Sequence, residues 1–123
     1  MNRTTDANAV AAVMDAYEAG TRNRDVAMLK GAFHENALMS GYLGPNLLVG
    51  GPEPFYAHLE ANEVEDSYAA RTVHIDVNGN AASARVVEDN LWGMSFVNDF
   101  HLVKGEDGWQ IVSKLFHHDA PGG

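Results

Sequence analysis

The sequence predicts an α+β fold, in which helices from the first half of the chain pack on one face of a curved antiparallel sheet. Two observations lead to this expectation. In the first half, apolar residues recur every three or four positions, whereas from Ala70 onward they alternate with polar residues. The alternating runs are also separated by turn-forming residues, at Asn78-Gly79 and at Gly105-Glu106-Asp107-Gly108, which is typical of β-hairpins.

Helical spacing and capping residues place the first two helices. The first helix is expected to have Asp6 as its N-cap and to end at Gly20. Its apolar positions are Ala9, Val10, Val13, Met14 and Tyr17. Asp25 can cap a second, shorter helix that carries Leu29 and Phe33. His34 would then lie at the end of this helix, where its side chain can satisfy free carbonyl groups.

Glycine and proline interrupt regular secondary structure in the segment that follows. Residues 36–49 are broken by Gly41 and Gly44, so short strands and turns are expected there. Gly50-Gly51-Pro52 opens a third helix, with Phe55 and Leu59 facing inward.

The alternation sets a register for both hairpins. If Asn78 and Gly79 fill the first turn, Ile75 lies opposite Ala82. In the second hairpin, Lys104 facing Trp109 places Asp99 opposite Lys114 and His101 opposite Val112. The face of Asp99 is expected to line the interior, and an apolar set on the other face is expected to be buried between two subunits. That set is Phe100, Leu102, Trp109, Ile111 and Leu115.

Composition limits the classes of function. A chain of 123 residues fits one domain, expected over 1–123 with an ordered core of about 6–118 and a disordered tail at 121–123. Without cysteine, disulfides and thiolate metal sites are excluded, and a net charge of −9 disfavours nucleic acid and anionic membranes. No signal peptide or membrane-spanning run is legible, so a cytoplasmic location is expected. Dinucleotide, P-loop and serine-hydrolase motifs are absent, and no cofactor is expected.

Three tracts carry a resemblance to a known family. They are a helix–turn–helix ending in Phe-His-x-x-Ala (20–41), the first hairpin (73–87), and the second hairpin with Gly-Trp-x-Ile-Val and Lys-x-Phe-His (96–117). In order and spacing they resemble the nuclear transport factor 2-like superfamily, in the branch described as "putative lumazine-binding", near the SnoaL-like cyclases. The resemblance spans about Val10 to His118. It implies a cone-shaped α+β barrel of cystatin-like fold, a pocket between helices and sheet, and a homodimer through the outer sheet face.

The candidate catalytic residues are Asp99, His101, Lys114 and His118. Asp99 occupies a position similar to one where ketosteroid isomerases of this superfamily carry a neutral, hydrogen-bond-donating Asp. Here Lys114 opposite it would favour the ionised carboxylate, or the two could form a cross-strand ion pair with no catalytic role. His101 or His118 could carry a proton. No metal site is expected, because no His-x-x-x-His spacing or similar motif is present.

The ligand-binding candidates are mainly aromatic residues expected at the mouth of the barrel: Tyr17, Met39, Tyr42, Phe55, Trp92 and Phe116. Glu88 continues an inward-facing row, so it either lies inside the barrel or is turned outward by a bulge.

Two hypotheses about function remain open. One is a pocket for an apolar ligand with oxygen functions, in which the protein acts as a cofactor-free acid–base isomerase, dehydratase or cyclase. In that case Asp99 acts as the base or as the partner of an oxyanion, and Lys114 is the electrostatic orienter. The other is a non-catalytic, dimeric binding or interaction domain. The resemblance does not separate them, since the superfamily contains enzymes and adaptors alike.

Overall fold

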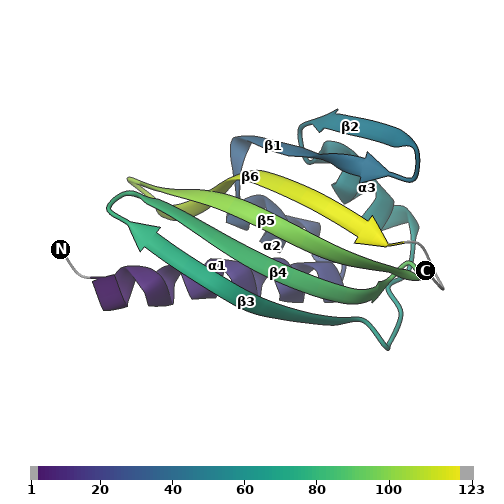
Figure 1. Ribbon diagram of the computed structural model, residues 1–123, viewed down its shortest axis with the longest axis horizontal. Coiled ribbons are helices and arrows are strands. Elements are labelled where there is room, and N and C mark those ends of the chain that lie inside the picture. The colour runs from purple at the N-terminus through teal and green to yellow at the C-terminus, as the bar shows by residue number, and fades with distance from the viewer. Residues whose placement is uncertain (1–2, 120–123) are drawn as a thin grey trace.

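Three helices lie on one face of a strongly bent, six-stranded sheet (Figure 1). The computed structural model describes residues 3–119, so the expectation for the tail at 121–123 lies outside the described residues. The helices are α1 (Arg3–Arg22), α2 (Val26–Ala32) and α3 (Glu53–Ala61). The strands are β1 (Phe33–Leu43), β2 (Asn46–Gly50), β3 (Ala69–Asn78), β4 (Ala81–Leu91), β5 (Met94–Gly105) and β6 (Gly108–Asp119).

The sheet is mixed and is not closed into a barrel. Its strand order is β2-β1-β6-β5-β4-β3. All neighbours are antiparallel except β1 and β6, which pair in parallel. Because β6 lies between β1 and β5, the last described strand is in the interior of the sheet. The bend leaves room for α1 and α2 against β3–β6, while α3 and the β1–β2 hairpin stand over the other end (Figure 1).

The caps of the first two helices were predicted in part. Asp25 caps α2 as expected, and its carboxylate accepts the backbone N–H of Met28 at 3.1 Å. Asp6 is not the N-cap of α1, because the helix begins at Arg3. Its buried carboxylate instead accepts hydrogen bonds from Lys104 Nζ (2.9 Å) and Trp109 Nε1 (3.2 Å), which ties α1 to the β5–β6 turn.

Two expectations about helix ends are corrected. Helix α1 continues past Gly20 to Arg22, and a Cβ at Gly20 would lie 2.8 Å from Leu29 Cγ, so the glycine lets α2 pack closely. Helix α2 ends at Ala32, and the chain enters β1 at once. His34 therefore lies in a strand rather than capping a helix, and its Nδ1 accepts the N–H of Asn36.

The first hairpin has a different turn from the one expected. Gly79 and Asn80 form the turn, because Asn78 already pairs with Ala81. Ile75 consequently lies opposite Ala84 rather than Ala82. Gly79 supplies the positive φ of +62° that this turn requires. The difference of two residues preserves the alternation, so the side chains keep their expected faces.

The second hairpin has the expected turn but a shifted register. Lys104 pairs with Trp109 as expected, but an irregularity between Leu102 and His101 leaves Val112 without a partner. Asp99 therefore lies opposite Leu115, and Phe100 lies opposite Lys114. The predicted Asp99–Lys114 and His101–Val112 pairs are wrong because this β-bulge moves the partner strand by one residue.

The face assignment of β5 is also reversed. Phe96, Asn98, Phe100 and Leu102 are buried under the helices, whereas Asp99 and His101 lie on the outer face. Trp109 and Ile111 of β6 are also in the core. Of the set predicted to be buried between subunits, only Leu115 lies on the outer face, with 53% of its surface exposed.

Candidate functional site

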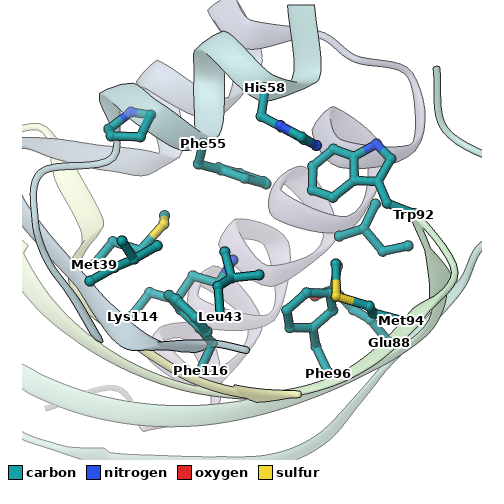
Figure 2. Close-up of a pocket in the computed structure, with 13 residues that line it drawn as sticks. Met39, Leu43, Phe55, His58, Glu88, Trp92, Met94, Phe96, Lys114 and Phe116 are labelled. Atoms are coloured by element: carbon teal, nitrogen blue, oxygen red, sulfur yellow. The ribbon is translucent and has the colours of Figure 1, made fainter. Parts of the chain in front are cut away.

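A cavity of about 270 Å³ opens between α3, the β1–β2 hairpin and the concave face of the sheet (Figure 2). Its lining is mainly apolar, and the charged side chains in it are Lys114 and Glu88. The lining residues are Met39, Leu43, Leu48, Pro54, Phe55, His58, Glu88, Leu91, Trp92, Met94, Phe96, Lys114 and Phe116.

Helix α3 and the β4–β5 turn form the upper wall. Figure 2 shows Phe55 and His58 descending from the helix toward the side chains that rise from the sheet. The His58 and Trp92 rings meet edge to face at 4.2 Å, and Trp92 also contacts Phe55. Because His58 is exposed while Phe55 is half-buried, this wall runs from the solvent-exposed mouth to the interior.

Lys114 of β6 is the cation on the floor of the cavity. The residue is only 4% exposed, and its Nζ donates a hydrogen bond of 2.8 Å to the Tyr17 hydroxyl. The same nitrogen lies 4.4 Å from the ring centroid of Phe55, 4.9 Å from that of Tyr17 and 5.9 Å from that of Phe116. An ammonium group over aromatic faces is stabilised by the ring quadrupoles, most strongly when water is excluded.

Burial changes the acidity of this lysine. Desolvation lowers the pKa of Lys114 from 10.5 to about 8, although the negative charge of Glu88 acts in the opposite direction. The ammonium form therefore loses protons near neutral pH far more readily than an exposed lysine does.

Glu88 of β4 is the matching carboxylate, and it is 1% exposed. Its Oε1 accepts hydrogen bonds from the Tyr17 hydroxyl at 3.0 Å and from Asn98 Nδ2 at 2.5 Å. Its Oε2 accepts one from the Tyr68 hydroxyl at 2.5 Å. Burial and the nearby carboxylate raise the pKa of Tyr17 and of Tyr68, so both phenols stay neutral and continue to donate.

The strand register explains how the polar groups meet. Glu88 lies opposite Phe96, and Asn98 follows two residues later on the same face of β5. Lys114 lies opposite Phe100, again two residues beyond Asn98. Glu88, Asn98 and Lys114 therefore form a diagonal row across three adjacent strands. Tyr17 reaches this row from α1 and joins the two charged ends.

A carboxylate outside the cavity fixes the turn that carries Trp92. Asn90 (φ 59°) and Trp92 (φ 53°) have positive φ, which is costly for residues other than glycine. Glu65 accepts the backbone N–H groups of Trp92 at 2.9 Å and Gly93 at 2.7 Å. Although burial opposes it, this bonding lowers the pKa of Glu65, and it holds the turn in its strained conformation.

Most of the predicted ligand-binding residues meet at this cavity. Met39, Phe55, Trp92 and Phe116 line it. Tyr17 lies beneath it, where its hydroxyl links Lys114 to Glu88. Tyr42 does not join them: its surface is 58% exposed, and it is absent from the lining.

The predicted catalytic residues are dispersed. Of these, Lys114 lies in the cavity. Asp99 is on the outer face of the sheet, where Arg85 Nε and Nη2 donate to its two carboxylate oxygens at 2.8 and 3.2 Å. His101 is exposed on that same face. His118 is half-buried near the end of β6, and its Nε2 accepts the N–H of Gly44.

Sequence reasoning missed Asn98, Tyr68, Glu65 and His58, and left Glu88 undecided. Asn98 alternates with Phe96 and Phe100, which is the signal that could have placed it in the interior. Tyr68 precedes β3 in an irregular segment, where no periodicity applies.

Comparisons with known proteins agree with this architecture. A protein of unknown function from Shewanella baltica OS155, described as NTF2-like, superposes with a TM-score of 0.89 at 26% identity, over 97% of this chain and 98% of that one. A second NTF2-like protein of unknown function, from Methylobacillus flagellatus KT, has a TM-score of 0.86 at 29% identity, over 94% of each chain. No curated protein matches the chain.

The described helices include none that is both long and apolar enough to cross a membrane. The family model described as "Putative lumazine-binding" matches residues 5–117, which is nearly all of the sequence. The fold of the structural neighbours is the one that the three sequence tracts predicted. The chain therefore belongs to this family, within the NTF2-like superfamily.

Proposed function

We propose that the protein binds a compact, mostly apolar molecule in the cavity and holds an oxygen atom of that molecule, such as a carbonyl oxygen, against Lys114 and Tyr17. The observation that carries the proposal is the buried ammonium of Lys114 on the floor of an otherwise apolar cavity.

The cost of burying this charge supports a binding role. Removing an ammonium ion from water costs several kcal/mol, and replacing a buried ion pair by apolar residues is often neutral or stabilising. A lysine that served only to fill the core would therefore be a poor choice at this position. The arrangement is useful when a ligand supplies an acceptor, because hydrogen bonds to a charged donor are worth about 1.5–3 kcal/mol.

The hydrogen-bonded chain also supports acid–base chemistry. Lys114 donates to the Tyr17 hydroxyl, and that hydroxyl donates to Glu88. A proton can therefore move from the ammonium to the carboxylate without a large displacement of any side chain. A ligand carbonyl near Lys114 would be polarised, which favours loss of a proton from the adjacent carbon. This is the chemistry that isomerases, dehydratases and cyclases share.

Binding can be tested with two probes of nearly the same shape. Acetophenone carries a carbonyl oxygen, and isopropenylbenzene has a methylene group in its place. Amide chemical shifts should move around Phe55, Trp92 and Phe116 with both compounds, and acetophenone should bind about tenfold more tightly. In Lys114→Met this preference should disappear. Equal affinity of both probes for the unaltered protein, or shifts confined to other parts of the chain, would contradict the proposal.

Catalysis is tested separately from binding. In D₂O, the methyl protons of acetophenone should exchange faster with the protein present than with Lys114→Met. Binding without faster exchange would favour the second hypothesis, a non-catalytic binding domain.

We also propose that two copies associate through the outer face of the sheet. Exposed apolar side chains on this face support it, since an isolated sheet face usually carries fewer of them. They are Leu38 (54% exposed), Val73 (50%), Val103 (39%) and Leu115 (53%). Sedimentation should give a dimer at micromolar concentration for the unaltered protein and a monomer for Leu115→Glu. A monomer in both cases would refute the proposal.

A further inference from the structure

We infer that Lys114 forms a covalent imine with an aldehyde or ketone bound in the cavity. The inference rests on the proposed function, since the carbonyl compound must first bind beside this lysine. It goes further, because the lysine becomes a nucleophile instead of a hydrogen-bond donor.

The placement of the amine favours attack on a bound carbonyl carbon. Lys114 projects from the sheet into the lined space, on the opposite side from Phe55 (Figure 2). Among the described residues, Tyr17 is the hydrogen-bond acceptor for its Nζ, and the other close neighbours are the faces of Phe55 and Phe116. A structural ammonium is normally satisfied by several acceptors, whereas this nitrogen keeps donor positions for a ligand.

The protonation state supports the same role. With the pKa of Lys114 lowered to about 8 by burial, about a tenth of the molecules carry the neutral amine at pH 7, against well under a thousandth for an exposed lysine. Desolvation, which lowers the pKa of the amine, is a common way to activate a lysine nucleophile.

The local groups can move the proton that the reaction requires. The ammonium gives a proton to Tyr17 as the Tyr17 proton passes to Glu88, which leaves a neutral amine and a neutral carboxylic acid. The amine nitrogen then bonds to the carbonyl carbon, and one of its protons moves to the former carbonyl oxygen, giving a carbinolamine. The proton held by Glu88 returns through Tyr17 to that hydroxyl, and the C–O bond breaks with loss of water.

The step balances without any other reactant. An ammonium and a carbonyl compound are converted into an iminium ion and water, so charge is conserved and nothing is oxidised or reduced. The positive charge of the iminium nitrogen stays at the end of the Lys114 side chain, where the rings of Phe55 and Phe116 already face a cation. The carboxylate of Glu88 is restored as its counter-charge.

The chain contains its own controls, because its three lysines are Lys30, Lys104 and Lys114. Lys30 is exposed, and Lys104 is half-exposed and paired with Asp6. Benzaldehyde with cyanoborohydride at pH 7 should fix the imine as a benzyl group. Peptide mapping should find Lys114 labelled at least about tenfold faster than either other lysine. Benzyl alcohol, which fits the same space but cannot form an imine, should slow the labelling of Lys114 only.

Variants separate this inference from the proposed function. Lys114→Met should lose the fast label and still show cavity shifts with benzyl alcohol, whereas Lys30→Met should keep the fast label. If benzyl alcohol shifts the cavity amides but Lys114 of the unaltered protein is labelled no faster than Lys30, the imine inference is wrong and the binding proposal stands. If neither compound shifts the cavity amides and Lys114 is not labelled, both are wrong. Because the mapping is made on the unaltered chain, the result does not depend on whether Lys114→Met folds.

Discussion

The hydroxyl of Tyr17 donates a 3.0 Å hydrogen bond to Oε1 of Glu88, a residue 71 positions later in the chain. The same hydroxyl oxygen accepts a hydrogen bond from the Lys114 ammonium. One buried phenol thus connects a cation on β6 to an anion on β4, so the two charges do not touch and yet depend on each other.

A double-mutant cycle should measure this dependence. Glu88→Gln and Lys114→Met each leave one buried charge without its partner, and the double variant leaves none. Each cost is a loss in the free energy of unfolding. We expect the sum of the costs of the two single variants to exceed the cost of the double variant by about 1–3 kcal/mol. Denaturant melts of the four proteins at pH 7 give the result. Arg85→Met with Asp99→Asn is the matched control, because that ion pair is about half-exposed and should couple by under about 1 kcal/mol. Additive costs at Glu88 and Lys114 would mean that the charges are independent.

Stability should rise with pH above neutrality because of Lys114. Below about pH 8 the lysine is protonated in both the folded and the unfolded chain. Between about pH 8 and 10 the unfolded chain binds this proton and the folded one does not, since burial lowers the folded pKa from 10.5 to about 8. The free energy of unfolding should therefore increase by about 2 kcal/mol over this range, relative to Lys114→Met.

The gain should end above about pH 10. There Tyr17 and Tyr68 ionise in the unfolded chain but stay neutral in the folded one, because their folded pKa values are raised. The folded state then binds more protons than the unfolded state, so stability is lost as pH rises. Urea melts at intervals of half a pH unit would show the maximum. A flat difference between the unaltered protein and Lys114→Met from pH 7 to 10 would refute the shift of Lys114.

Gly41 should tolerate no side chain. It has a φ of +151°, and a Cβ there would collide with the carbonyl oxygen of Phe116 on the neighbouring strand. Gly41→Ala should cost about 2 kcal/mol or more in thermal or urea unfolding, and it should weaken binding of acetophenone, because Phe116 lines the cavity. Gly31→Ala is the control: nothing lies within 4 Å of a Cβ at that helical position, so stability should rise by up to about 1 kcal/mol.

Glu65 should control the position of Trp92. Glu65→Gln keeps the shape but weakens the two hydrogen bonds from the β4–β5 turn, so the strained turn should relax. We expect faster hydrogen exchange at Trp92 and Gly93, and weaker binding of acetophenone by about threefold to tenfold. Glu63→Gln, two residues away and exposed, should change neither quantity. Unchanged exchange in Glu65→Gln would show that the turn holds its conformation without the carboxylate.

The sequence predicted the order of the elements because their signals are local. The cap at Asp25, the start of α3 after Gly50-Gly51-Pro52 and the turn at 105–108 each depend on a few neighbouring residues. The parallel pairing of β1 with β6 has no such signal, since paired positions such as Leu38 and Ser113 lie 75 residues apart in the sequence. That pairing is also what brings Met39 into the same wall as Phe116.

The site was predicted less well because it depends on side-chain parity along two strands. Both faces of the β5–β6 hairpin carry apolar residues, so hydrophobicity alone does not choose between Asn98 and Asp99 as the inward residue. The bulge at Val112 then lets Ile111 and Lys114 both face inward, three residues apart, which strict alternation forbids. Lys114 lies on the inner face, as expected, whereas Asp99, its predicted partner, lies on the outer face.

The interior position of β6 has a consequence for how the chain folds during synthesis. β6 is hydrogen-bonded to β1 on one side and to β5 on the other. β1 can pair with β2 as soon as both are made, but the other edge of β1 has no partner strand until β6, which begins at Gly108, has left the ribosome. Contacts between such distant segments form slowly, because a long loop must close before they are made. The nascent chain therefore carries an unpaired strand edge at β1 until β6 is available, and this edge is where binding of a chaperone or aggregation would begin.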